Sequence, residues 1–273
     1  MTRRDTGAPD PAGRGIPGRR LPNQAIHVSY HKNLTVFFDA TMRLVRKATL
    51  GRVRHKHFNS EAERFLREHG AYTIASLNNH PPLDSLDYTG PVTQFVRDPR
   101  DLVVSGYFYH LRGAEAWTRI VDPAPGDFAV VNGTIPPEMP AGLSFSGYLQ
   151  TLSVEDGLLA ELAFRRHHFD AMRAWARCGW PNLLTLHYEE IVRDYGRAMA
   201  RVLAHHGFGP GVQAIGRAAA RYRGSPAGRR SPHVRNPAPS QWHRTFTPKV
   251  ADAFAARHED LPALLGYPPT AST

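Results

Sequence analysis

The sequence predicts an α/β fold in three layers, with a mostly parallel central sheet flanked by helices on both faces. Short β-rich apolar runs alternate along the chain with longer segments whose apolar residues recur at helical spacing. The 273 residues are 41% hydrophobic and 10% aromatic, which is ample for a packed core. We expect a disordered basic arm over 1–22, a single domain over 23–269 and a short tail over 270–273.

The first strand and helix lie on either side of a lysine-bearing segment. Residues 24–30, "QAIHVSY", form a β-rich run, and residues 35–48 predict a helix. The helix is indicated by apolar residues at helical spacings, namely Val36, Phe37, Ala40, Leu44 and Ala48.

The second unit begins with a helix-start signal. Ser60 and Glu63 form a capping box, and the helix is expected to end before Gly70. Residues 71–77, "AYTIASL", then predict a strand, and the two prolines of the following "NNHPPLDSL" indicate a loop.

The third unit is the most clearly marked. Residues 91–96, "PVTQFV", predict a strand that leads directly into a helix. Asp98 can cap that helix, Pro99 suits its first position, and Asp101 is placed to complete a capping box.

The second half of the chain is mostly helical. Residues 113–143 are rich in Gly and Pro and predict a long, lid-like loop, whereas 145–178 predict helices with a capped start at Ser153. Further elements are a buried strand at 182–188, helices near 196–206 and 212–222, a basic loop at 223–240, and a last helix capped by Thr247 and Pro248.

Charge and cysteine content restrict the function. The net charge of +10 and a pI near 10.1 fit a nucleic acid, an acidic surface or a polyanionic small ligand equally well. A single cysteine excludes an internal disulfide framework and a Cys-rich zinc site. No apolar leader or run of about 18 apolar residues occurs, so we expect a cytoplasmic protein without a membrane partner.

The segment "SYHKNLTVFF" (29–38) predicts an anion site. It joins a strand to a helix, so the amides from Asn33 to Val36 open the helix beside Lys32. An ordinary turn with an exposed lysine fits this stretch alone equally well. Because the segment lacks glycine, we expect Leu34 to have an unstrained backbone.

The segment "FVRDPRDLVVSGYFYH" (95–110) is more specific. Arg97 lies at a strand end just before a well-capped helix, where its guanidinium can bind an anion, and Ser105 lies two turns inside that helix. The alternative, in which Arg97 pairs with Asp98 or Asp101, is the weaker one once both segments are considered.

Four segments in order resemble the family of sulfotransferases that use 3′-phosphoadenosine-5′-phosphosulfate (PAPS), cytosolic and bacterial small-molecule enzymes among them. "SYHKNLTVFF" resembles the 5′-phosphosulfate loop P-K-S-G-T-T-W, and "RDPRDLVVSGYFYH" resembles the 3′-phosphate motif. "LNNHPPLDSL" resembles K-T-H-L-P, and "HVRNPAPSQWHRTFTP" resembles R-K-G-x-x-G-D-W-x-x-x-F-T. The resemblance spans roughly residues 24–267 and implies a sheet related to that of P-loop nucleotide kinases.

The resemblance implies a role for each matching residue. The 5′-phosphosulfate would be held by Lys32 and Thr35, with the backbone of Asn33, Leu34 and Val36, and Phe37 would stack on adenine. The remaining roles fall to Arg97, Ser105 and Arg235 at the 3′-phosphate, Tyr188 near adenosine, and His80 as general base. Lys32 and Ser105 would also belong to the catalytic group.

The sequence departs from the family pattern at several positions. His31 replaces proline, Leu34 glycine, Val36 threonine, Asn78 lysine, and Asn236 with Pro237 the Lys-Gly pair. Val36 lacks a hydroxyl and Pro237 an amide donor, so these departures predict weaker donor binding.

The expected reaction moves a sulfuryl group to a hydroxyl or amine of a small molecule, such as a natural product, without a metal. A nucleotide kinase or NTPase is the first alternative, although GxxxxGK[ST] is absent; a nucleic-acid-binding module using residues 1–22 and 223–235 is the second. We expect no specific nucleic acid.

Other side chains receive structural interpretations. The histidines at 55–57, 167–168 and 205–206 are expected on solvated faces rather than at a metal. An aromatic set could line an acceptor pocket or belong to the core: Phe108, Tyr109, Trp117, Phe128 and Phe145.

Overall fold

The computed structural model describes residues 24–59, 61–78, 88–180, 182–228 and 238–269. Its strands are β1 Ala25–Val28, β2 His55–His57, β3 Ile74–Leu77, β4 Val92–Val96 and β5 Leu183–His187. They form one parallel sheet in the order β2-β3-β1-β4-β5. The predicted α/β class and parallel sheet are confirmed.

The helices follow the predicted alternation. They are α1 Thr35–Ala48, α2 Ala62–Glu68, η1 His69–Ala71, α3 Pro99–His110, η3 Ala116–Arg119, α4 Pro125–Phe128, η4 Ala129–Val131, α5 Phe145–Thr151, α6 Val154–Phe164, α7 Arg166–Arg177, α8 Tyr188–Arg193, α9 Tyr195–His205, α10 Pro210–Gly224, α11 Trp242–Thr245, α12 Pro248–His258 and α13 Asp260–Leu264. None of these helices is long and apolar enough to cross a membrane.

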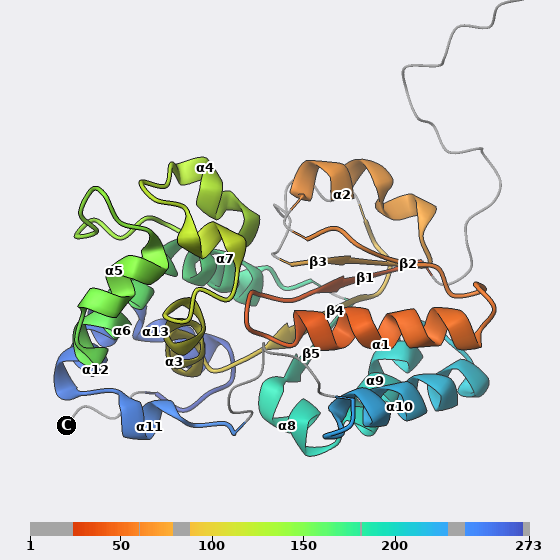
Figure 1. The fold of residues 1–273 in the computed structure, drawn as a ribbon. Coiled ribbons are helices and arrows are strands. Elements are labelled where there is room, and N and C mark those ends of the chain that lie inside the picture. The colour runs from red at the N-terminus through yellow and green to blue at the C-terminus, as the bar shows by residue number, and fades with distance from the viewer. Residues whose placement is uncertain (1–23, 60, 79–87, 181, 229–237, 270–273) are drawn as a thin grey trace, which may run out of the picture.

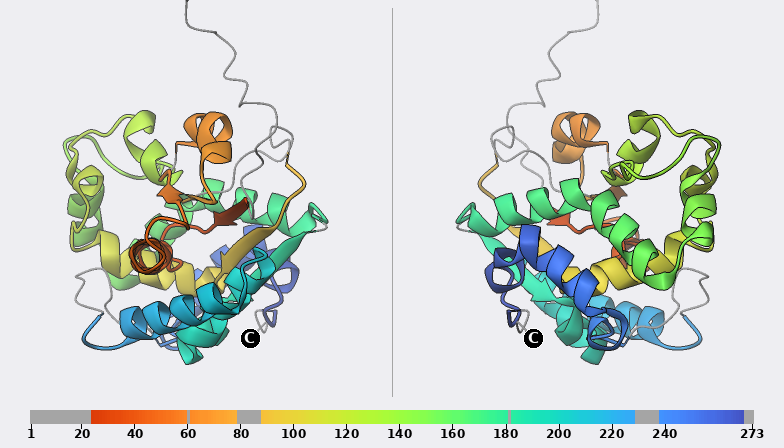
Figure 2. Two further views of the ribbon diagram at one scale, coloured as in Figure 1. Left: turned by 90° about the vertical axis from the view of Figure 1, so that its right-hand side faces the viewer. Right: turned by 90° about the vertical axis from the view of Figure 1, so that its left-hand side faces the viewer.

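Helices cover both faces of the sheet. Figure 1 shows α2 on one side and α1, α9 and α10 on the other, and Figure 2 shows the sheet between α2 above and α10 below. Alternate residues of β1 enter different cores, because successive side chains of a strand point to opposite faces. Ala25 packs with Phe38 of α1, and Ile26 packs with Phe65 of α2.

A third core lies beyond the carboxyl ends of the strands. It is built from α3, α5, α6, α7 and α12 and includes Tyr30 and Val96, which lie at or just beyond the ends of β1 and β4. The predicted lid-like segment contributes to it, since Trp117 and Phe128 are buried there with Phe145. These aromatic side chains are therefore core residues.

The helix expected at 35–48 is α1, but its buried face differs from the apolar set that indicated it. Its buried residues are Phe38, Thr41, Met42 and Val45, whereas Val36 is 49% exposed. The two sets are alternative apolar stripes of one helix, and the contact with α10 and the sheet selects the second.

The prediction of solvated histidines was also wrong in part. Residues 55–57 form the edge strand β2, where the side chain of His55 is 2% exposed. His168 and His206 are buried as well, and His206 Nε2 lies 3.0 Å from Thr93 Oγ1. Burial, the main cause, lowers the pKa of both His55 and His206 to about 3.

Helix starts agree with the predicted caps in most places. Asp98, Ser153 and Thr247 each accept a hydrogen bond from a backbone N–H in the first turn of α3, α6 and α12. Ser60 lies outside the described residues. Asp101 does not complete the expected capping box, because its carboxylate accepts instead from the amides of Ser240 and Trp242.

Candidate active site

The candidate site lies where the chain changes direction across the sheet. From β1 the chain continues to β2 and β3 on one side, whereas β4 and β5 lie on the other. Ligands of open parallel sheets bind at such a switch point, outside the carboxyl ends of the strands. Here the two segments that meet are the β1–α1 loop, residues 29–34, and the turn between β4 and α3.

The β1–α1 loop has a backbone that normally requires glycine. Lys32 has φ +69° and Leu34 has φ +62°, both in the left-handed region. The prediction of an unstrained backbone at Leu34 was therefore wrong. The loop keeps the path that glycine allows at the cost of two strained residues, roughly 1–2 kcal/mol each.

Hydrogen bonds hold this loop in place. Asn33 is buried; its N–H donates to Tyr30 O (3.0 Å) and its Nδ2 donates to Phe95 O at the end of β4. Thr35 Oγ1 lies 2.8 Å from Ser29 Oγ and donates to Asn78 Oδ1 (3.2 Å). Asn78, which departs from the family lysine, thus ties the end of β3 to the start of α1.

The start of α1 has no side-chain cap among the described residues. Leu34 occupies the N-cap position but has no side-chain acceptor, so it cannot satisfy the first N–H groups of the helix. These amides and the positive end of the helix dipole favour an anion there. Phe37 is partly buried, and its ring centroid lies 4.8 Å from that of Tyr195.

Lys32 lies beside this helix start. Its Nζ is 3.3 Å from the centroid of the Tyr109 ring. Burial, the largest cause, lowers the pKa of Lys32 to about 7, while Glu115 acts in the opposite direction and Arg97 adds to the lowering. The side chain is therefore partly neutral near pH 7, and its amine gains a proton when an anion binds nearby.

Arg97 is the most informative side chain of the site. It is 3% exposed, its guanidinium lies 4.2 Å from the centroid of the Tyr188 ring, and Nη1 donates to Lys32 O at 3.3 Å. Among the described residues no hydrogen-bond acceptor reaches Nε or Nη2, and the nearest carboxylate, Asp101, is 4.0 Å from Nη2. A buried cation with two unpaired donors is costly unless a ligand completes it.

The alternative pairing of Arg97 with Asp98 is not found among the described contacts. Asp98 instead binds Arg100, with Nη2 at 2.7 Å from Oδ2, and Arg100 stacks 3.9 Å from the Trp242 ring. Asp101 also binds the backbone at Ser240 and Trp242. These contacts bring the segment that follows Arg235 against α3, although Arg235 itself lies outside the described residues.

The structure brings together most of the predicted donor-binding residues. Direct contacts join Arg97 to Lys32 and to Tyr188. The first turn of α1, which contains Thr35 and Val36, follows Lys32 closely in the chain. Ser105 is partly exposed on α3. His80 and Arg235 lie outside the described residues, so their roles stay predictions.

Sequence reasoning missed a set of buried polar residues behind the loop. His31 Nε2 lies 3.2 Å from His110 Nε2, and His110 Nδ1 lies 2.7 Å from Glu161 Oε2. Arg165 Nε donates to the other Glu161 oxygen at 2.8 Å. The four-residue spacing of Glu161 and Arg165 in a helical segment was the one available signal.

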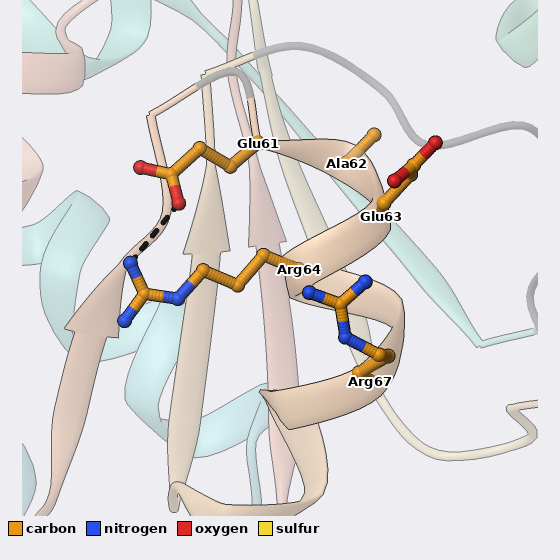
Figure 3. A pocket seen from close by; sticks show the side chains of 5 residues that line it. All are labelled: Glu61, Ala62, Glu63, Arg64 and Arg67. Carbon is orange, nitrogen blue, oxygen red and sulfur yellow. Dashed lines mark hydrogen bonds and ion pairs between the residues drawn. The ribbon is translucent and has the colours of Figure 1, made fainter.

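A surface hollow elsewhere does not involve these residues. It is lined by Glu61, which precedes α2, and by Ala62, Glu63, Arg64 and Arg67 of α2, and Figure 3 shows the ion pair between Glu61 and Arg64. No group of three or more potential metal ligands occurs among the residues that the structure describes.

Comparison with known proteins gives structural matches only. No family model matches the chain, and no curated protein matches it by sequence. The structure of mouse sulfotransferase SULT7A1 complexed with PAP (adenosine 3′,5′-bisphosphate) matches with a TM-score of 0.53 and 19% identity, covering 89% of this chain and 87% of that one. The structure of retinol dehydratase complexed with androsterone and PAP gives a TM-score of 0.47 and 16% identity, covering 88% of this chain and 81% of that one.

The match to SULT7A1 extends over nearly the whole of both chains, and the arrangement of sheet and helices is common to the two. The chain therefore has the sulfotransferase fold.

Proposed function

We propose that the protein transfers a sulfuryl group from PAPS to a hydroxyl or amine of a small-molecule acceptor. The observation that carries this proposal is Arg97, a buried guanidinium at the switch point of a sulfotransferase fold, with two donors that no described residue satisfies. A phosphate that binds Nε and Nη2 of Arg97 would supply the missing acceptors.

The described residues fit a nucleotide with phosphates at both the 3′ and 5′ positions. Arg97, with Ser105 and Arg235 as the resemblance implies, would hold the 3′-phosphate. Lys32, Thr35 and the uncapped amides of α1 would hold the 5′ end, and Phe37 and Tyr188 would flank the nucleoside. A lysine and an arginine contributed by two different loops suit such a ligand better than a single phosphate.

PAPS supplies an activated sulfuryl group, and the chain supplies position and charge. Lys32 gains a proton as the anion binds, so an ammonium faces the bridging oxygen on which negative charge grows. The helix-start amides of α1 share that charge. The resemblance gives the general-base role to His80.

A labelled-sulfate transfer screen tests the proposal. PAPS is offered with phenols, alkyl alcohols, amines and sugars, and we expect transfer to at least one small-molecule class without added divalent metal. Magnesium-dependent binding of ATP together with no binding of PAP would contradict the proposal and favour a nucleotide kinase.

A further inference from the structure

We propose that Glu161, His110 and His31 form a proton relay whose outer residue, His31, accepts the proton of the attacking hydroxyl. The inference rests on the proposed sulfuryl transfer and names a base within the β1–α1 loop itself. His31 is the catalytic residue of this relay, whereas His110 and Glu161 act through it as positioning residues.

The geometry fixes the direction of the relay. Glu161 Oε2 accepts from His110 Nδ1 (2.7 Å), so the lone pair of His110 lies on Nε2. That nitrogen accepts from His31 Nε2 at 3.2 Å, and the two rings are stacked within 8° of parallel. The lone pair of His31 is consequently on Nδ1, which no side chain or backbone group among the described residues bonds.

The three residues of the relay are buried, and the carboxylate at its inner end is fully paired. His110 and Glu161 are fully buried, and His31, next to Lys32 in the chain, is 6% exposed. A buried carboxylate is stable only when it is paired and hydrogen-bonded. Glu161 has both, because Oε1 accepts from Arg165 Nε and Oε2 from His110.

Gly106 permits this arrangement. It lies on α3, which packs against α6, and an added Cβ would collide with Glu161 Oε1 and with Arg165 Nη2. Only glycine allows the carboxylate to approach α3 so closely. The packing therefore keeps Glu161 in line with His110.

Each proton transfer in the relay has a named donor and acceptor. The hydroxyl proton moves to His31 Nδ1 as its oxygen attacks sulfur, and the Nε2 proton of His31 moves to His110 Nε2. The resulting His110 imidazolium lies against the Glu161 carboxylate, which stabilises the charge. After the products leave, the proton returns along the same route to solvent.

Several charged groups surround the relay. They are Lys32 on the loop, Glu115 before η3 with Oε2 at 4.0 Å from His31 Nε2, Arg165 between α6 and α7, His168 on α7, and Arg97 near Lys32 and Arg165. Burial first, and then His110, holds the pKa of His31 well below its usual value. Since a bound polyanionic donor favours the protonated form, His31 becomes a stronger base only when the donor is present.

The test compares two phenols of different acidity. At about pH 8.5 an unsubstituted phenol is mostly protonated and needs a base, whereas 4-nitrophenol is mostly ionised and does not. We expect His31→Asn to slow single-turnover transfer from PAPS to phenol by about 100-fold or more, and transfer to 4-nitrophenol by less than about fivefold. PAP affinity, measured by calorimetry, should stay within about threefold.

Glu161→Gln is the second variant, and it should show the same acceptor-dependent loss at about tenfold or more. Gly106→Ala, whose added Cβ displaces Glu161, should behave in the same way. Thermal unfolding confirms that each variant is folded, and Arg43→Ala on the exposed side of α1 serves as the matched control with no effect.

Three outcomes would overturn the relay. An equal loss for both phenols in His31→Asn would indicate a structural role, and no loss would show that the proton takes another path. An acceptor-dependent loss in His80→Ala but not in His31→Asn would assign the base to His80. A parent protein that neither binds PAP nor transfers sulfate contradicts the proposed function itself, before any variant is compared.

Discussion

The β1–α1 loop and the β4–α3 turn occupy equivalent places in the fold but are built differently. Each connects the carboxyl end of a parallel strand to the start of a helix. At α3 Asp98 caps the helix and Pro99 fills its first position, so local rules account for the turn. At α1 no side chain caps the helix, and Lys32 and Leu34 have left-handed backbones.

The difference separates a rigid support from a strained binding element. The β4–α3 turn holds Arg97 at a position that its own sequence determines. The β1–α1 loop has no side-chain cap and a strained backbone, and its Lys32 lies shortly before the uncapped start of α1 in the chain. Violations of local preference of this kind concentrate at functional sites.

Arg97→Ala should have the largest effect on PAP affinity, since it removes the phosphate-binding side chain that the β4–α3 turn supplies. A charge-assisted bond to phosphate contributes about 1.5–3 kcal/mol, so PAP affinity should fall roughly 10- to 100-fold. Binding of adenosine 5′-phosphate should change little. Calorimetry with both nucleotides checks this, and equal losses for the two would mean that Arg97 does not read the 3′ position.

Lys32 should make PAP binding depend on protons. Its pKa of about 7 leaves it mostly neutral at about pH 8, and an anion raises that pKa, so binding should take up close to one proton there and much less at about pH 6. Calorimetry in buffers of different ionisation enthalpy measures the uptake. Lys32→Arg, permanently charged, should abolish it; an unchanged uptake in this variant would assign the proton to another group.

The same pKa gives the pH dependence of stability. Lys32 has a folded-state pKa lowered from 10.5, so the unfolded chain binds more protons between about pH 7 and pH 10. Its contribution to the free energy of unfolding of the ligand-free protein should therefore rise with pH through this range. Chemical denaturation of the parent and of Lys32→Met should show the difference, which must vanish if Lys32 titrates normally.

At the position of Leu34, glycine should give a larger free energy of unfolding than alanine. At φ +62° a Cβ costs about 1–2 kcal/mol, so Leu34→Gly should be more stable than Leu34→Ala by about 1 kcal/mol. At the exposed helical Ala48, glycine should instead cost about 1 kcal/mol. Urea unfolding measures both pairs, and the same sign at the two positions would contradict the strained loop.

Pro99→Ala should have the smallest effect. Proline at the first helical position restricts the unfolded chain, so its loss should lower the free energy of unfolding by about 0.5–1 kcal/mol. PAP affinity should remain within about twofold, because Asp98 still caps α3. A large loss of affinity would show that the turn is less rigid than its cap and proline indicate.

The same contrast explains what the sequence could predict. The alternation of elements, the capped start of α3 and the meeting of Lys32 with Arg97 follow from local signals and the parallel sheet. The edge strand β2 could not be predicted, because its three residues carry no apolar pattern and only pairing with β3 defines them. Packing between segments distant in sequence determines which face of α1 is buried. The same kind of packing buries His31, His110 and Glu161.

The left-handed backbone at Leu34 could not be predicted from the sequence either, because the residue type disfavours positive φ. Leucine is rarely found at positive φ, and here the bonds from Asn33 and Thr35 and the packing of Leu34 against the core support it. Strain of this kind becomes visible only in the structure.

Calorimetry of the parent protein with PAP and with adenosine 5′-phosphate, in the absence of divalent metal, tests the central claim most directly. If the unpaired donors of Arg97 are completed by a 3′-phosphate, PAP should bind at least about tenfold more tightly than the nucleotide that lacks it. Equal affinities for the two nucleotides would contradict the assignment of this site to a PAPS-type donor.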